Sequence, residues 1–320
     1  MVSQRKIPSY GEECINMVDF TDCPVRNKAY AGANGSKISI IYNNEQYMLK
    51  FPALPKKNKD ISYANGCISE YIGCNIFKDV GIEAQNTILG TYRRNGKEKI
   101  VVACKDFTSP GVVLQDFASL KNTIIDSEHN GYGTELDDIL SAIEEQTAVD
   151  PIMLKEWFWD VFIVDAFIGN WDRHNGNWGF LYNTITDEMK LAPVFDCGSC
   201  MYPQADEEIM KAVLENKEEM NKRIFTIPLS GIRSNGKKIN YFNFISSLEN
   251  QDCNKALKRI IPRINMSKIS EMIDEIPYIS DLQKTFYKTM LSERKERILD
   301  FSLEKLKKRE IKRSKFNMER

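Results

Sequence analysis

The chain has 320 residues, of which 42% are hydrophobic, and its 44 basic residues almost balance its 45 acidic ones. This composition is typical of a folded protein with a substantial core, and a net charge of −1 gives no general attraction to nucleic acid or anionic membranes. The longest apolar stretch, residues 151–169, contains four charged residues and is therefore interpreted as a buried helix rather than a transmembrane segment. The N-terminus does not resemble a secretory signal peptide, which favours a cytoplasmic protein.

The eight cysteines are sparse and irregularly spaced, so no disulfide framework is predicted and reduced thiols are expected. Cys197 and Cys200 form the single CxxC pair, and the chain has only two histidines. These are too few ligands for a tetrahedral zinc site, so the thiols are interpreted as ordinary packed or surface groups.

Two pairs of strands are predicted in the first hundred residues. Residues 37–51 place two β-rich runs around Asn43-Asn44, and Lys50 ends the second run. The runs NTILGTYRR and KEKIVVACKDF are separated by Asn95-Gly96, a strong hairpin signal.

A helix is expected between these pairs, because apolar residues recur at helical spacing from residue 61 to residue 80 and Gly81 follows them. This helix carries Glu70. Residues 1–108 are therefore expected to form a small β-rich lobe with one helix.

Residues 109–320 are expected to form a second, mostly helical lobe, giving an α+β fold of two lobes. Its central helix begins with Asp150 as a plausible N-cap and Pro151 at the first helical position. The predicted elements are helices at 112–125, 135–147 and 151–169, a β hairpin near 178–196, and charged helices and loops after residue 205.

Residues 293–320 hold eleven Lys or Arg residues against six Asp or Glu residues. A solvated terminal helix that frays is the preferred interpretation of this basic tail. A patch that attracts nucleic acid or lipid headgroups electrostatically is the alternative.

The segment GNWDRHNGNWGFL, residues 169–181, places Asp172, His174 and Asn177 in one short loop, and Asp196 follows in APVFDCGSC. Phosphoryl transfer needs a carboxylate that accepts the proton of the attacking hydroxyl and oxygen ligands for Mg²⁺. Protein kinases supply these groups with an Asp, an Asn five residues later and a second Asp that begins an Asp-x-Gly turn. The order Asp172, Asn177, Asp196 follows that arrangement.

Lys50 at the end of a strand and Glu70 in the next helix strengthen the kinase interpretation. In kinases a helix Glu holds a strand Lys so that its ammonium points at the α- and β-phosphates. The alternative is two unrelated surface charges.

Backbone groups are expected to bind the rest of a nucleotide at two places. AGANGSK, residues 31–37, is a tight turn before a strand, and such turns expose N–H groups to phosphate oxygens. VVACKDF would connect the lobes and bind adenine, although an edge strand followed by a loop is the simpler interpretation. The candidates are Gly32, Ala33, Asn34, Gly35, Ser36 and Lys37 for phosphate and the backbone of Cys104, Lys105 and Asp106 for adenine.

A Ser/His/Asp hydrolase is disfavoured, because only His129 and His174 are present and the chain has no G-x-S-x-G sequence. His174 is expected to orient its loop beside the catalytic and nucleotide-binding groups rather than to act as a base.

Taken together, AGANGSK, YMLKFP, SEYIGCNIFKDVG, VVACKDF, FIGNWDRHNGNWGF and APVFDCGSC resemble the HipA-like kinases, especially the CtkA-type bacterial protein kinases. The resemblance implies a two-lobed kinase-like fold, ATP and Mg²⁺ as cofactors, and phosphorylation of protein serine or threonine, including autophosphorylation. It also implies Asp172 as catalytic base, Asn177 and Asp196 as Mg²⁺ ligands, Lys50 as phosphate anchor and Glu70 as its partner.

The sequence departs from HipA-type toxins in two respects. The chain begins about thirty residues before its Gly-containing loop, so no antitoxin-binding N-terminal subdomain is evident. Ala29 stands near the position of the toxins' regulatory serine, whereas Ser36 is a candidate site of autophosphorylation. The motifs are also similar to phosphatidylinositol kinases, so a lipid or small-molecule kinase is the alternative substrate class, and an ATP-binding pseudokinase is the third hypothesis.

Overall fold

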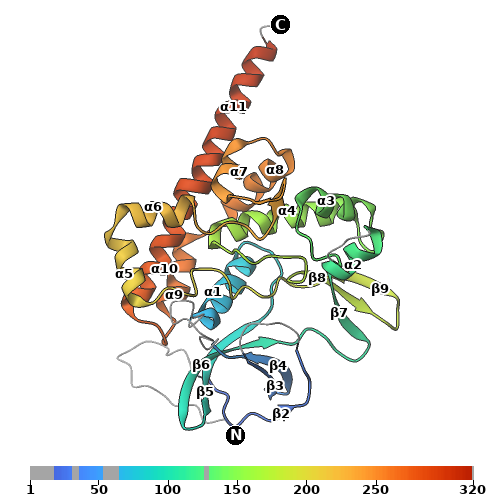
Figure 1. Cartoon of the computed structure of the whole chain (residues 1–320), viewed down its shortest axis with the longest axis vertical. Helices are drawn as coiled ribbons and strands as arrows, with labels where there is room; N and C mark the ends of the chain where they lie inside the picture. The colour runs from blue at the N-terminus through green and yellow to red at the C-terminus, as the bar shows by residue number, and fades with distance from the viewer. Residues whose placement is uncertain (1–17, 31–35, 53–64, 126–129, 319–320) are drawn as a thin grey trace.

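The protein is described by a computed structural model that covers residues 18–30, 36–52, 65–125 and 130–318. Figure 1 shows the long strands gathered at one end of the molecule and most helices at the other, where α11 (Phe301–Met318) projects from the body. The predicted phosphate-loop residues Gly32, Ala33, Asn34 and Gly35 lie outside the described residues.

A six-stranded sheet, in the order β1-β5-β6-β4-β3-β2, contains the strands of the first hundred residues. All neighbours pair antiparallel except β1 and β5, which are parallel. The strands are β1 (Val18–Asp19), β2 (Val25–Arg26), β3 (Lys37–Tyr42), β4 (Glu45–Lys50), β5 (Thr87–Arg94) and β6 (Lys97–Lys105).

Both predicted turns join strands of this sheet. Asn43 and Asn44 have φ angles of 48° and 62° between β3 and β4, and Asn95 and Gly96 have 52° and 73° between β5 and β6. Asn and Gly tolerate positive φ, so these turns fix the register of each strand pair. Lys50 is the last residue of β4, as the sequence predicted.

Helix α1 (Gly66–Asp79) packs against β5 and β6, which confirms the predicted helix that carries Glu70. The expected start of this helix, residues 61–64, lies outside the described residues. Cys67 of α1 packs on Val102 and Cys104 of β6, so the helix lies against the middle of the sheet. Gly81 follows the helix with a φ angle of 81°, and its N–H donates to the carbonyl of Lys78.

The chain beyond the sheet is mostly helical, and the mixed α and β architecture agrees with the predicted fold class. The helices are α2 (Phe117–Ile124), α3 (Leu136–Glu145), α4 (Pro151–Ile168), α5 (Glu207–Glu215), α6 (Lys217–Phe225), α7 (Tyr241–Ser247), α8 (Gln251–Ile260), the 3₁₀ turn η2 (Ile261–Arg263), α9 (Met266–Asp274), α10 (Asp281–Arg294), the π-helical segment η3 (Lys295–Asp300) and α11. The strands are β7 (Val112–Asp116), β8 (Gly179–Asn183) and β9 (Glu188–Leu191) in one sheet, and β10 (Arg233–Ser234) and β11 (Lys237–Lys238) in a hairpin.

The helix predicted at residues 112–125 is only partly correct. Residues 112–116 form β7, which pairs antiparallel with β8, and the helix α2 begins at Phe117. A short apolar run does not distinguish a strand from a buried helix, and the partner strand that decides between them is distant in the sequence. The hairpin predicted near residues 178–196 is confirmed as β8 and β9.

Helix α4 runs through the core and positions the loop that follows it. Eleven of its 18 residues are buried, which explains its nearly uniform apolar sequence. The Asp150 side chain accepts the N–H of Ile152 at 2.9 Å, which confirms the predicted N-cap. The helix ends at Gly169, whose φ of 65° turns the chain into residues 170–177.

The predicted C-terminal helix is present as α11. Its first turns are anchored, because Lys305 donates to the carbonyl of Ser246 and Arg309 to that of Leu248. Within the described parts of the chain, no helix combines the length and the apolar character needed to cross a bilayer.

Candidate active site

Lys50 is the centre of an ion-pair cluster formed by β4, α1 and the segment after β9. Its ammonium nitrogen lies 2.9 Å from Glu70 Oε2 and 3.1 Å from Asp196 Oδ1. Burial alone would lower the pKa of Lys50, but Asp196 and Glu70 together raise it well above its ordinary value. The predicted Lys–Glu pair is therefore formed, with a charged ammonium.

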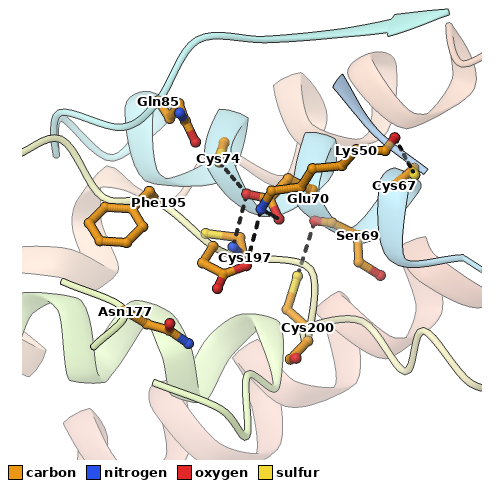
Figure 2. Close-up of polar contacts among 12 residues, drawn as sticks. Lys50, Cys67, Ser69, Glu70, Cys74, Gln85, Asn177, Phe195, Cys197 and Cys200 are labelled. Atoms are coloured by element: carbon orange, nitrogen blue, oxygen red, sulfur yellow. Dashed lines mark hydrogen bonds and ion pairs between the residues drawn. The ribbon is translucent and has the colours of Figure 1, made fainter. Parts of the chain in front are cut away.

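Glu70 also holds the backbone beside Asp196. Its second oxygen accepts the N–H of Cys197 at 3.2 Å, and its side chain is only 1% exposed (Figure 2). Helix α1 thereby positions both the lysine and the Asp196 segment. Asp196 itself has a φ of 57°, a left-handed conformation that an Asp adopts more readily than most residues.

The loop after α4 brings Asp172 and Asn177 together. The amide group of Asn177 donates to the carbonyl of Asp172 at 2.8 Å, and the N–H of His174 donates to the same carbonyl at 2.9 Å. The N–H of Asp172 donates to Asn170 Oδ1 at 3.1 Å. These bonds close the loop into a compact unit.

His174 belongs to this unit as an orienting residue. Its Nδ1 accepts the N–H of Gly176 at 3.0 Å, so a ring nitrogen is used within the loop. This contact fits the prediction that His174 orients its loop.

Arg173 connects the loop with α4 and with the segment that carries Asp196. Its guanidinium donates to both oxygens of Asp165, at 3.0 and 3.2 Å, and to the carbonyls of Asn177 and Phe195, at 3.0 and 2.7 Å. The residue is 5% exposed. One buried cation therefore joins the two segments that carry the candidate catalytic side chains.

The two aspartates have different electrostatic environments. Burial raises the pKa of Asp172. The charge of Asp196 raises it further, whereas His174 lowers it. In contrast, Lys50 lowers the pKa of Asp196, although partial desolvation opposes this shift. Asp196 is thus held as an anion, whereas Asp172 has an increased affinity for a proton. Ser199 donates a long hydrogen bond of 3.4 Å to Asp172.

Comparison with known proteins assigns the family. Residues 25–276 match the family described as HipA-like C-terminal domain. The serine/threonine-protein kinase CtkA of Helicobacter pylori (strain J99 / ATCC 700824) is 51% identical over 285 residues, which cover 88% of this chain and 86% of that protein. The chain belongs to the HipA-like serine/threonine kinases. Its activity is that of an ATP-dependent serine/threonine protein kinase.

Solved structures agree with this assignment. The crystal structure of a Helicobacter pylori proinflammatory kinase CtkA aligns with a TM-score of 0.85 at 49% identity, covering 90% of this chain and 97% of that one. A Shewanella oneidensis MR-1 HipA, in complex with HipB and operator DNA, aligns with a TM-score of 0.54 at 16% identity, covering 87% of this chain and 67% of that one. The second similarity establishes the fold alone.

Lys37, the last residue of the predicted phosphate-binding segment, places a second ammonium near the cluster. Lys37 of β3 pairs in register with Lys50 of β4. Burial and the charge of Lys50 lower the pKa of Lys37, whereas Asp196 opposes the shift. Ser36 precedes it and is exposed.

The N–H groups of Lys105 and Asp106, two residues predicted to contact adenine, bind carbonyl groups within the protein. The N–H of Lys105 donates to Asn86 O at 2.8 Å, and the N–H of Asp106 donates to Gln46 O at 2.9 Å. Cys104 lies inside β6, between β4 and β5. Sheet pairing and loop contacts use the two N–H groups, so neither is available to a nucleotide in this conformation.

The Asp106 side chain is used within the protein as well. It accepts hydrogen bonds from Lys28, Tyr30, Gln46 and both the N–H and hydroxyl of Thr108. The Asp106 side chain is therefore a structural anchor of the segment after β6.

Kinase activity in this family requires ATP and implies a divalent metal ion, and the oxygen atoms at the site fit one. The amide nitrogen of Asn177 is bound to the Asp172 carbonyl, which leaves its oxygen facing the opposite way. Asp196 uses one carboxylate oxygen for Lys50, and its side chain remains 42% exposed. Amide and carboxylate oxygens are ligands for hard divalent cations.

In the part of the chain that the structure describes, no group of three or more His, Cys, Asp and Glu residues is arranged to hold a metal ion. The CxxC pair follows the prediction for its thiols. Cys197 and Cys200 are free and buried, and Cys200 donates to the carbonyl of Ser69 (Figure 2). The protein thus supplies only some of the oxygen ligands that a divalent cation needs. This suits a cation whose other ligands come from nucleotide phosphates.

Sequence reasoning missed Arg173 and Asp165. In the sequence, Asp165 is one of the four charged residues that interrupt the apolar stretch 151–169. A carboxylate in a helix that is buried on every face needs a partner, because an unpaired buried charge is costly. This requirement indicates that Asp165 forms a buried ion pair, and Arg173 in the next loop is the cation that could pair with it.

Proposed function

We propose that this kinase transfers the γ-phosphoryl group of Mg²⁺-bound ATP to serine or threonine hydroxyls of proteins, with Asp172 as the catalytic base. The observation that carries the proposal is the contact of Lys50 with both Glu70 and Asp196, beside the loop that Arg173 ties to the Asp196 segment. The proposal treats residues 1–108 and 109–320 as two lobes with ATP between them.

Asp172 is assigned the proton of the attacking hydroxyl. Its backbone carbonyl is held by the Asn177 amide, and its carboxylate has a raised pKa, caused first by burial, which increases its proton affinity. As the hydroxyl oxygen attacks the γ-phosphorus, the bond from that phosphorus to the β–γ bridging oxygen breaks, and the hydroxyl proton passes to Asp172.

Lys50 and Lys37 are assigned to the phosphates, because the two lysines are directly paired at the ends of β3 and β4 and their charges act on each other. Asn177 and Asp196 would hold Mg²⁺ through their free oxygens. When bound, the ion would neutralise phosphate charge and supply electrostatic stabilisation.

Adenine recognition is assigned to the backbone carbonyl of Asp106, one of the predicted residues, and to the N–H of Phe107, which follows it. These two groups directly follow the N–H groups of Lys105 and Asp106, which bind Asn86, just before β5, and Gln46 of β4. The ring of Phe107 lies 5.8 Å from that of Phe195, next to Asp196, so this segment lies beside the catalytic one.

The test is phosphoryl transfer from labelled ATP with Mg²⁺ to serine and threonine peptides, in the wild type and in Asp172→Asn. Loss of a catalytic base lowers rates by about 10²- to 10⁴-fold, so we expect a loss of this size. Asp137→Asn is the matched control, because Asp137 is exposed in the first turn of α3. Equal folding of the variants is checked by thermal unfolding.

Mass spectrometry then identifies the acceptor residues, including Ser36 if the chain autophosphorylates. An Asp172→Asn variant as active as wild type would remove the base from the proposal. Label found only in vesicles that contain phosphatidylinositol would replace protein by lipid as the substrate class. ATP binding without transfer to any acceptor would indicate a pseudokinase.

A further inference from the structure

The segment that carries the β10–β11 hairpin, residues 230–241, contacts the catalytic loop on both sides of the hairpin. A Cβ atom on Gly231 would approach the carbonyl oxygen of Arg173 to 3.0 Å, so the backbones of the two segments are in contact. On the other side of the hairpin, the hydroxyl of Tyr241 donates to the carbonyl of Asn170 at 2.6 Å. Both ends of the segment 230–241 are therefore fixed to the residues that flank Asp172.

The hairpin is also held rigidly on its outer side. Thr134 donates through its hydroxyl to Gly231 O at 2.9 Å, and its own carbonyl accepts the N–H of Arg233 at 2.8 Å. The N–H of Gly236 donates to Glu135 at 3.0 Å. Asn235 and Gly236 form the turn with positive φ angles, which matches the twist of a two-residue hairpin. A rigid element of this kind presents its side chains in fixed positions.

Those side chains are cationic. Arg233, Lys237 and Lys238 are exposed, and the hairpin contains no acidic residue. Arg233 binds the carbonyl of Gly236, whereas neither lysine forms a side-chain hydrogen bond or ion pair with another described residue. Lys238 is among the charges that act on the Asp172 carboxylate, opposing the larger effect of burial. Unpaired positive charge thus lies within electrostatic reach of the proposed base.

We propose that the β10–β11 hairpin binds the acceptor polypeptide and that Lys237 and Lys238 select serine or threonine residues flanked by aspartate or glutamate. This inference rests on the proposed function and names its substrate class. An acidic residue close to the acceptor hydroxyl would pair with these lysines while the hydroxyl lies at Asp172. Opposite charges at a docking surface favour the matching partner and disfavour like charge.

The test uses three synthetic peptides that share one acceptor serine and differ only in flanking residues: acidic, neutral amide or basic. We expect the wild type to have a kcat/KM at least about 5-fold higher for the acidic peptide than for the neutral one, as for an exposed ion pair near 1 kcal/mol. Lys237→Glu/Lys238→Glu is expected to reverse the order in favour of the basic peptide, with the KM for ATP unchanged. The neutral variant Lys237→Gln/Lys238→Gln is expected to abolish the preference.

Lys97→Glu/Lys99→Glu is the matched control, because these lysines follow the Asn95-Gly96 turn of the β5–β6 hairpin in the large sheet. It is expected to retain the wild-type preference. Equal wild-type rates on the three peptides, or an acidic preference that survives both changes at Lys237 and Lys238, would overturn the inference. Those results differ from failure of the proposed function, in which no acceptor is phosphorylated in an Asp172-dependent way.

Discussion

Arg173 shows how much a single buried residue contributes to this site. Its guanidinium pairs with Asp165 of α4 and also binds the carbonyls of Asn177 and Phe195. The ion pair satisfies the buried charges, and the carbonyl contacts align the two segments that carry Asp172 and Asp196. We expect the loss of charge compensation and the loss of alignment to have different effects in variants of Arg173.

Arg173→Met is expected to destabilise the protein by about 3–5 kcal/mol, because Asp165 remains buried without its partner. The double variant Asp165→Leu/Arg173→Met is expected to recover most of this stability, since apolar residues replace the buried pair. Urea unfolding measures both effects.

The double variant is nevertheless expected to have low kcat, because nothing then holds the carbonyls of Asn177 and Phe195. A double variant with wild-type stability and wild-type kcat would show that Arg173 has no role in alignment.

Asp106 anchors the segment after β6. This segment connects the six-stranded sheet with the mostly helical part of the chain. Burial by itself would raise the pKa of Asp106, but hydrogen bonds from Lys28, Thr108 and Tyr30 lower it below its ordinary value. Because the folded-state pKa is depressed, the stabilisation is complete above the unfolded-state pKa of about 3.9 and is lost as pH falls through the lower folded value.

We expect Asp106→Asn to reduce the free energy of unfolding by about 1–3 kcal/mol at pH 7, since an amide presents one acceptor oxygen where the carboxylate presents two. The difference from wild type is expected to persist at pH 5 and to shrink only below about pH 4. Urea unfolding at pH 7, 5 and 3.5 tests this. A difference that disappears already at pH 5 would contradict the assigned hydrogen-bond network.

At the scale of elements, the sequence correctly predicted those features that depend on residues close together in the chain. The turns at Asn43-Asn44 and Asn95-Gly96, the N-cap at Asp150 and the buried helix α4 follow from turn chemistry, capping and apolar periodicity. β7 was predicted as helix because its partner β8 is not adjacent in the sequence. The hydrogen bonds of the Lys105 and Asp106 N–H groups were not predictable from local pattern, because their partners, Asn86 and Gln46, come from other strands or loops.

At the scale of the whole molecule, the fold brings Lys50, Glu70 and Asp196 into contact although 146 residues separate the lysine from the aspartate. The sequence order of these residue types was sufficient to predict their convergence, because phosphoryl transfer needs this combination of charges. The contacts of Arg173 that align the catalytic segments could not be predicted from sequence order alone. They depend on which buried charges the fold places side by side.

The central claim is that Lys50, held by Glu70 and Asp196, anchors the nucleotide phosphates. The most direct measurement is the affinity of a non-hydrolysable ATP analogue with Mg²⁺, determined by calorimetry for wild type, Lys50→Met and the exposed control Lys97→Met. Loss of one charged hydrogen bond to phosphate predicts about 10- to 100-fold weaker binding for Lys50→Met and no change for the control. Equal affinities for all three proteins, with Lys50→Met shown to be folded, would contradict the account.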